Sequence, residues 1–466
     1  MSLGRLFYHS AIYGLTTALS RFLNWLLTPL YVHRLPMEDF GRLSELYSWI
    51  AFGLIATGLG METTYFRFAR KSSAAPLFWR SFRLLLLVGS LPGLGSAALV
   101  PFIADELRYE GRENLLWLTI AIWTVDAWGA FTLAHQRLMG TPWRFALIQL
   151  THVLLLLGLN LWGVGLRGYG LEFILTANLF ASLLRLGWGI SWGPPFSMSD
   201  TVATSSLLRY GATLAIIGLL GATNDVLDRV LLARYSWTDT ALYSAAYKIA
   251  MALALFIQAY RQAGEPLLLS EHRGDHTFYR RSWTFYHNVA LCGVLLLTLW
   301  SEPLLMTQWG GLLPKPIFPP SYHKAFCVVP LLLWAHLFMG SLVQASIWYK
   351  LSEKPVAGLP ITATGSLITW IGNLYGIPRY GYIASAWTTL LAYAVMVSLS
   401  VWRGRKRLPG VFEFKEIAIP VLLVAIITIG YLKMELPAEE VGWRLWLSGI
   451  GIGVIGFHLY RLLRRG

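Results

Sequence analysis

The chain has 466 residues, of which 56% are hydrophobic and only 13% are charged, and its formal net charge is +14. Soluble globular domains usually carry about 25% charged residues, so this composition excludes an ordinary soluble fold and predicts a polytopic membrane protein. The two cysteines, Cys292 and Cys327, lie in apolar segments without CxxC or histidine spacing. The sequence therefore indicates neither a disulfide framework nor a zinc site, and we predict no metal and no cofactor.

Apolar stretches long enough to cross a membrane recur along the whole chain, and we expect about fourteen transmembrane helices. They are expected at residues 8–32, 40–64, 82–104, 114–136, 143–165, 170–192, 206–233, 240–268, 283–308, 324–349, 355–376, 381–402, 416–433 and 443–462. These stretches are too long and too continuous to be the alternating strands of a barrel, which predicts an all-α fold. The first stretch exceeds the length of a signal peptide and carries Arg21, so we expect a retained helix.

The distribution of basic residues predicts the orientation. If both termini are cytoplasmic, the connectors on that side hold most of the 38 Lys and Arg residues, including the group from Arg403 to Arg407. This is the positive-inside bias, so the net charge reports topology and contact with an anionic leaflet, and we expect no nucleic-acid partner. On this count the basic residues left inside spans are Arg21, Arg229 and Lys248.

A weak internal repeat divides the chain. The segment 34–47 matches 234–247 with Arg, Asp and Tyr at identical spacing, and Asn24 pairs with Asn224 at the same offset upstream. We therefore expect two lobes of six helices each, residues 1–202 and 203–408, followed by two further helices in 409–466. Because each lobe holds an even number of spans, the repeat is parallel, about an axis along the membrane normal.

Charged residues inside the spans are the candidate functional residues, because a charge at the bilayer centre costs about 2.5–3.5 kcal/mol on insertion scales. Arg21 lies near the middle of the first span, and Lys248 lies about nine residues into the eighth, so either could neutralise a phosphate. The alternative for Arg21 is a structural partnership with Asp126 or Asp228. Asp126 itself is a candidate cation or proton site.

A second group lies in the seventh span. Asp225, Asp228 and Arg229 share one helical face, so Asp225 and Arg229 could form a local ion pair that only lowers the cost of insertion. The alternative is a gate whose pairing changes between states, with coupling to H+ or Na+ through the aspartates.

Polar residues complete the candidate substrate-binding set. Asn24 and Asn224 are included as the paired residues of the repeat. Tyr247 could stack on sugar, although tyrosines of the interfacial belt are common, and Arg261 could act on the cytoplasmic side, although snorkelling also explains it.

Several of these segments resemble a known family. The stretches 36–49, 224–232, 241–250 and 379–386 are similar to polysaccharide flippases of the O-antigen and teichoic-acid exporter type. These belong to the superfamily that also contains the lipid II flippase and the multidrug and toxin extrusion transporters. The resemblance implies two lobes around a central cationic cavity that opens alternately to each side of the membrane.

The resemblance also implies the cargo and the location. The cargo would be an oligosaccharide on a polyprenyl diphosphate, moved from the cytoplasmic to the outer leaflet of the bacterial cytoplasmic membrane. A polysaccharide polymerase or glycosyltransferases are the partner proteins that such a role implies, beside membrane lipid. The protein would be a transporter and not an enzyme.

Two alternatives stay open. One is a cation-coupled multidrug exporter of the same superfamily, for which basic residues such as Arg21 and Lys248 are unfavourable. The other is a membrane glycosyltransferase that uses a lipid-linked sugar, with Glu38 and Asp39 as carboxylates. Asp39 recurs as Asp239 in the repeat, which favours a structural turn.

Overall fold

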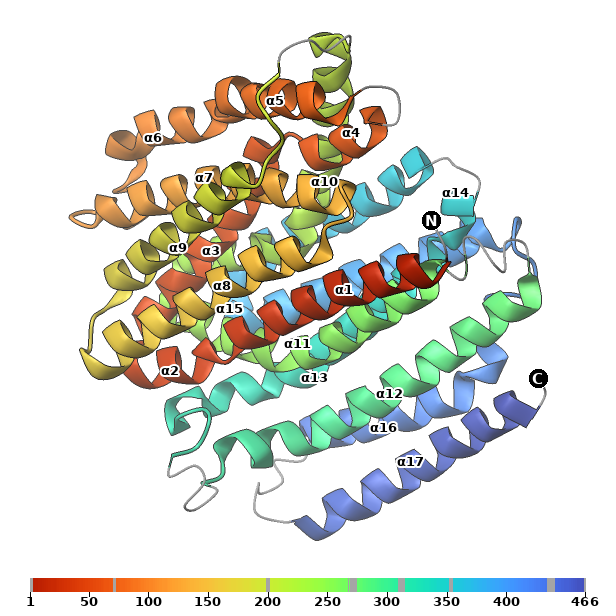
Figure 1. The fold of residues 1–466 in the computed structure, drawn as a ribbon. Coiled ribbons are helices and arrows are strands. Elements are labelled where there is room, and N and C mark those ends of the chain that lie inside the picture. Colours follow the sequence, from red (N-terminus) through yellow and green to blue (C-terminus); the bar gives the residue numbers. More distant parts are fainter. Residues whose placement is uncertain are drawn as a thin grey trace. The chain divides into compact units, whose positions relative to one another are not determined.

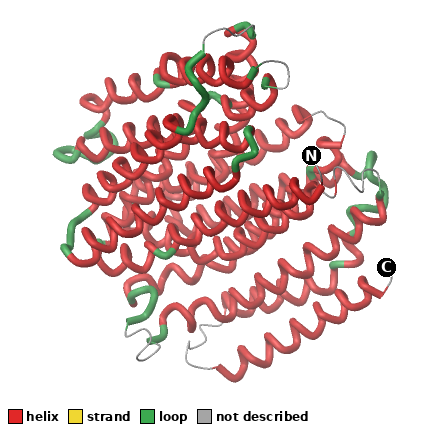
Figure 2. Tube along the Cα trace, viewed as in Figure 1, coloured by secondary structure: helices red, strands yellow, loops and turns green. Residues whose placement is uncertain are grey.

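The structure, a computed structural model, describes residues 3–69, 73–197, 202–266, 268, 275–308, 315–351, 355–433 and 441–464. Over these residues the chain is built from helices and loops, with no strand (Figure 2). Ten helical stretches among them are long and apolar enough to cross a membrane. The prediction of an all-α polytopic membrane protein is confirmed.

The helices divide into two compact units, Met1–Thr238 and Asp239–Gly466. The helices of the first unit (Figure 1) are α1 Leu3–Trp25, α2 Leu27–Arg34, α3 Met37–Gly58, α4 Met61–Phe68, α5 Ala74–Leu84, the π-helix η1 Leu85–Gly89, α6 Leu91–Ile103, α7 Glu113–Leu138, α8 Pro142–Asn160, the π-helix η2 Leu161–Leu166, α9 Leu171–Ser191 and α10 Thr204–Tyr235. The repeat predicts a division of the chain after residue 202. That division is based on sequence similarity and the two compact units on packing, so the predicted division stays a prediction.

The second unit contains most of α11 Trp237–Pro266 and the rest of the chain. Its further elements are α12 His276–Met306, the 3-10 helix η5 Pro320–Val328, α13 Val329–Ala345, α14 Ile347–Leu351, the 3-10 helix η6 Pro355–Gly358, α15 Leu359–Gly404, the 3-10 helix η7 Phe414–Glu416, α16 Ala418–Lys433 and α17 Val441–Arg464. α13 packs on α15, and α12 packs on both α13 and α17.

Two expected spans are interrupted by breaks between helices, and a third break lies between two expected spans. Leu59 and Gly60 have φ of 47° and 57°, which ends α3 and starts α4 inside the expected span 40–64. Pro29 near the start of α2 lacks an N–H, which accompanies the break after α1. In α15 the break is at Gly381, with φ 54° and ψ −139°, so this long helix contains the two expected spans 355–376 and 381–402.

In the first unit, α7 packs against both α3 and α9, α8 packs on α1, and α10 packs on α3. A cluster of buried aromatic side chains joins α4, α5 and α7. Tyr65 is fully buried there among Phe78, Phe82 and Phe131, and its hydroxyl lies 2.8 Å from Nδ1 of His135. The satisfied hydroxyl and the ring contacts hold α4 and α5 in fixed positions relative to α7.

The two C-terminal helices are held to α12 by a buried polar cluster. Glu302 of α12 accepts a hydrogen bond of 2.9 Å from the hydroxyl of Tyr431 in α16. Arg444 of α17 is completely buried, lies 3.9 Å from the Glu302 carboxylate and donates to the carbonyl oxygen of Leu299. A buried charge of this kind is tolerated only with such partners, so α16 and α17 are integral parts of the second unit.

Candidate functional site

A close approach between backbones positions the first candidate site. α10 crosses the break between α3 and α4, and a Cβ on Gly211 would lie 2.4 Å from the carbonyl oxygen of Leu59. Gly60 stands equally close to Gly211, since a Cβ on it would lie 2.8 Å from the Gly211 carbonyl oxygen. Small residues at this crossing let the helices touch, which brings α4 alongside the first turns of α10.

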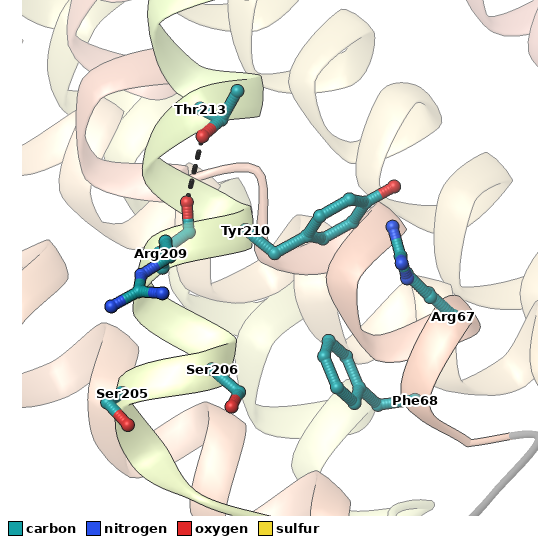
Figure 3. A pocket seen from close by; sticks show the side chains of 7 residues that line it. All are labelled: Arg67, Phe68, Ser205, Ser206, Arg209, Tyr210 and Thr213. Carbon is teal, nitrogen blue, oxygen red and sulfur yellow. Dashed lines mark hydrogen bonds between the residues drawn. The ribbon is translucent and has the colours of Figure 1, made fainter. Parts of the chain in front are cut away.

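A pocket of about 430 Å³ lies between these two elements. It is lined by Arg67, Phe68, Ser205, Ser206, Arg209, Tyr210 and Thr213, and we call it the α4–α10 pocket (Figure 3). The Arg67 guanidinium lies 4.2 Å from the centre of the Tyr210 ring, a cation–π contact that orients both side chains. The view shows Arg209 on the opposite side of α10 from Arg67, with the two serines about one turn earlier on α10.

The lining of the α4–α10 pocket includes an exposed polar stripe on α10. Ser205, Arg209 and Thr213 follow one another at intervals of four residues, and all three are exposed. α10 is long and apolar enough to span a membrane, and an exposed polar stripe on such a helix is stable only where water reaches it. Guanidinium and hydroxyl groups suit a phosphate, and the Phe68 and Tyr210 rings suit a sugar face.

Sequence analysis missed this pocket. Arg67 lies in a connector between two expected spans, where its charge agrees with the positive-inside bias, and Arg209 lies near the start of the expected span 206–233. The available signal was the four-residue spacing of Ser205, Arg209 and Thr213, which begins one residue before the expected helix 206–233.

The charged cluster predicted in the seventh span lies further along α10. Asp228 is 1% exposed and Arg229 is 9% exposed, whereas Asp225 is exposed. Nη1 of Arg229 donates to the main-chain carbonyl oxygen of Asp225 at 3.0 Å, and a carboxylate oxygen of Asp228 accepts from the Arg229 N–H at 2.8 Å. This bond runs to the main chain of Asp225, so an ion pair between the Asp225 and Arg229 side chains stays a prediction. Asn224 is buried and donates to the carbonyl oxygen of Leu220.

Asp126 of α7 is paired with an arginine that sequence analysis did not consider. Nη2 of Arg185 in α9 lies 2.7 Å from a carboxylate oxygen of Asp126, and the two side chains are 10% and 18% exposed respectively. The sequence analysis did not name Arg185 among the basic residues inside spans, although it lies well inside α9. A carboxylate with this partner has a structural explanation that a lone intramembrane aspartate would lack.

Arg21 and Asn24 lie about one turn apart on α1, and both side chains are exposed. α1 packs on α8, and several of its apolar side chains, among them Leu15 and Phe22, are also exposed. Arg21 therefore lies among exposed apolar side chains of α1, and its position inside the membrane stays a prediction.

The remaining candidates are on α11. Tyr247 and Lys248 are half-buried, and the Tyr247 ring contacts the ring of His336 in α13 edge-on at 5.0 Å. Tyr243, one turn earlier, is fully buried and its hydroxyl lies 3.1 Å from that of Thr389. Arg261 is exposed toward the other end of the helix. Packing therefore explains the presence of Tyr243 at its position, while the side chain of Lys248 stays partly exposed.

Glu45 is a further buried acidic residue of an expected span that sequence analysis overlooked. It is 2% exposed in α3, and its carboxylate accepts hydrogen bonds from the Tyr109 hydroxyl at 2.9 Å and from the Trp237 indole at 3.2 Å. Burial, together with the adjacent Glu45 carboxylate, raises the pKa of Tyr109 well above its ordinary value, so the hydroxyl stays a donor. The Trp237 ring also lies 3.7 Å from Arg42 and 4.3 Å from Arg108. This cluster anchors the end of the first unit.

Comparison with known proteins places the fold. No family model and no curated protein matches the chain. Among solved structures, the "Lipid II flippase MurJ, inward closed conformation" matches with a TM-score of 0.74 over 97% of this chain and 99% of that chain, at 12% identity. The chain has the fold of this flippase structure. An inward-facing multidrug resistance MATE family transporter of the MOP superfamily matches with a TM-score of 0.68 over 84% of this chain and 95% of that chain, at 15% identity.

A MATE structure in complex with MaD3S gives a TM-score of 0.59 over 87% of this chain and 96% of that chain, at 16% identity. The MOP-type fold agrees with the superfamily that the sequence motifs indicated. At these identities the likeness concerns the fold, and the cargo has to be argued from the residues of this chain.

Proposed function

We propose that this protein is a flippase that moves a polyprenyl-diphosphate-linked oligosaccharide from the cytoplasmic to the outer leaflet by alternating access. The observation that carries the proposal is the α4–α10 pocket, where Ser205, Ser206 and Arg209 are exposed on a helix of membrane-spanning length and Arg67 of α4 also lines the pocket. A diphosphate cannot cross hydrocarbon unassisted, so a carrier must give the head group a wet cationic surface while the prenyl chain stays in lipid.

The pocket residues suit the parts of such a head group. Arg67 and Arg209 would bind phosphate oxygens, Ser205 and Ser206 would donate hydrogen bonds, and the Tyr210 ring would face a sugar. The cations on other helices, Arg21 and Lys248, are proposed as further contacts along the route of the phosphates. Arg229, Asn24, Asn224, Tyr247 and Arg261 remain proposed substrate-binding residues, and Asp225, Asp228 and Asp126 remain proposed gating or ion-coupling residues.

The fold comparison is compatible with both cargoes, since flippase and MATE structures both match this chain. The cationic lining of the α4–α10 pocket favours an anionic cargo, since a cationic drug would be repelled by Arg67 and Arg209. The multidrug exporter is therefore the second candidate, supported by the fold alone.

The test is transport by the purified protein in proteoliposomes. The probe is an undecaprenyl-diphosphate-linked disaccharide that carries a fluorophore, and dithionite quenching from outside measures its movement between leaflets. We expect the protein to accelerate this movement, and we expect Arg67→Gln/Arg209→Gln to lower the rate about tenfold or more at limiting probe, since each lost charge-assisted contact contributes about 1.5–3 kcal/mol.

The matched control is Arg403→Gln/Arg405→Gln, which removes the same charge from exposed positions at the end of α15. It should transport at the unaltered rate. Ethidium efflux measured in the same vesicles separates the alternatives: ethidium transport without movement of the lipid probe would identify a drug exporter.

A further inference from the structure

A second cationic recess lies on another side of the first turn of α10. Its volume is about 490 Å³, and it is lined by Arg80, Arg83, Leu84, Leu87 and Thr204. Arg80 and Arg83 are about one turn apart on α5, Leu84 ends α5 and Leu87 lies in η1. The recess is therefore charged at one end and apolar at the other along a single run of helix.

The apolar end continues as a stripe that faces lipid. Arg83 is followed at intervals of three or four residues by Leu87, Leu91 and Leu94, whose side chains are 64%, 57% and 64% exposed. This run of helix, Ala74–Ile103, is long and apolar enough to span a membrane. The stripe is apolar, unlike the polar face that α10 presents at the α4–α10 pocket, and we therefore expect acyl chains and not water against it.

Neighbouring contacts mark the depth and shape of the recess. The Trp79 indole N–H donates to the carbonyl oxygens of Pro194 and Pro195, each at 3.1 Å, and Trp is typical of the head-group level. The Arg80 guanidinium donates to the carbonyl oxygen of Val202, which ties α5 to the segment that leads into α10. Snorkelling by itself would bring the two guanidinium groups to this level, but it does not explain a recess of head-group size beside them.

We propose that this recess binds an anionic phospholipid of the surrounding membrane, with its phosphate against Arg80 and Arg83 and an acyl chain along Leu87, Leu91 and Leu94. Arginine binds phosphate through a planar fork of donors, and each basic residue near a membrane surface favours anionic lipid over zwitterionic lipid. Thr204 of α10 closes the other wall, so the bound lipid would touch both α5 and α10. The proposal is independent of the transported cargo.

The experiment is native mass spectrometry of the full-length protein titrated with phosphatidylglycerol or with phosphatidylcholine. We expect the unaltered protein to bind phosphatidylglycerol about tenfold more tightly, and we expect Arg80→Gln/Arg83→Gln to abolish that preference. Arg403→Gln/Arg405→Gln is the control for loss of charge and should keep the preference. Equal affinity for the two lipids, or an equal loss of preference in both variants, would overturn the proposal.

Because Arg80 also bonds to Val202, its replacement could weaken folding, and two further variants avoid that difficulty. Arg83→Gln keeps the contact with Val202 and should lower phosphatidylglycerol affinity severalfold. Thr204→Trp fills the recess while both arginines remain, and it should also lower the affinity severalfold. Full binding in Thr204→Trp would show that the recess is not the site.

Discussion

Asp126 and Arg185 show how a membrane span keeps a charge. The pair is close, at 2.7 Å, and largely withdrawn from solvent, so each side chain neutralises the other. We expect Asp126→Asn and Arg185→Gln each to destabilise the protein by about 2–4 kcal/mol, because each leaves one charge without its partner, and we expect the double variant to recover most of that loss. Thermal unfolding of the three purified variants in detergent measures the effect.

A transport assay on the same variants distinguishes scaffold from ion coupling. If the pair is only structural, the double variant should transport normally once its amount in the membrane is matched. A stable double variant with no transport would instead assign Asp126 to coupling.

Arg21 and Lys248 are cations of the first and eighth expected spans, and they give a second prediction. Arg21→Ala and Lys248→Ala should each lower transport of the labelled lipid about tenfold or more while the protein is still made and inserted, because each removes a charge-assisted phosphate contact. The measurement is the proteoliposome assay, with membrane abundance checked by immunoblot. Lys433→Ala, at the end of α16, is a comparison that should have no effect. Unaltered transport in both alanine variants would mean that the two cations are structural.

The sequence could not show which charged side chains contact one another. Hydropathy shows that Asp126 is deep in a span, but the partner, Arg185, is 59 positions away in the chain, and only packing of α7 on α9 brings the two together. Glu45 was overlooked for a similar reason, since its partners Tyr109 and Trp237 come from a loop and from the end of the first unit. A single sequence shows the depth of a charge far more readily than its neighbours.

Among the elements, α15 contains the clearest backbone constraint. Gly381 has φ 54°, and a Cβ there would lie 2.3 Å from a carboxylate oxygen of Asp239. Gly381→Ala should therefore destabilise the protein by about 1–3 kcal/mol, because alanine rarely adopts this backbone conformation and would also displace Asp239. Thermal unfolding of the purified variant measures the loss.

Gly430→Ala is the matched control for this substitution. Gly430 lies inside α16, and a Cβ there would meet nothing within 4 Å. Alanine should be neutral or slightly stabilising at that position because glycine is a poor helix former. Equal melting temperatures for the two variants would contradict the constraint at Gly381.

The positions of the helices could be predicted from the sequence because a span needs an uninterrupted apolar run, and such runs are visible without an alignment. The breaks were harder. The connector expected between 376 and 381 corresponds to the kink at Gly381, whereas the break at Leu59 and Gly60 falls inside an expected span. Hydropathy does not depend on backbone dihedral angles, so it does not show such breaks. The break at Leu59 and Gly60 matters because α10 crosses there and forms the α4–α10 pocket.

At the scale of the whole molecule, the all-α membrane fold could be predicted from composition and spans, and the fold comparison agrees with the superfamily that local motifs indicated. The α4–α10 pocket could not be predicted, because it depends on two helices far apart in sequence that meet at Gly60 and Gly211. A basic residue near the end of a span can reflect either the orientation of the protein or contact with a ligand, and its residue type does not separate the two. Only placement on an exposed polar face separates Arg209 from a residue of the positive-inside bias.

The last prediction concerns the path of the chain through the membrane. Between Lys315 and Lys406 the chain first runs through η5, α13 and α14 and then through α15, which the kink at Gly381 divides into two helices. Three crossings follow if each half of α15 spans, so these two lysines should lie on opposite sides of the membrane. The basic group from Arg403 to Arg407 places that end in the cytoplasm and Lys315 outside. Reporter fusions after Lys315, Lys350, Tyr380 and Lys406 should therefore read outside, inside, outside and inside. If α15 crossed only once, Lys350 and Lys406 would be on opposite sides, and the two-crossing reading of the Gly381 kink would be wrong.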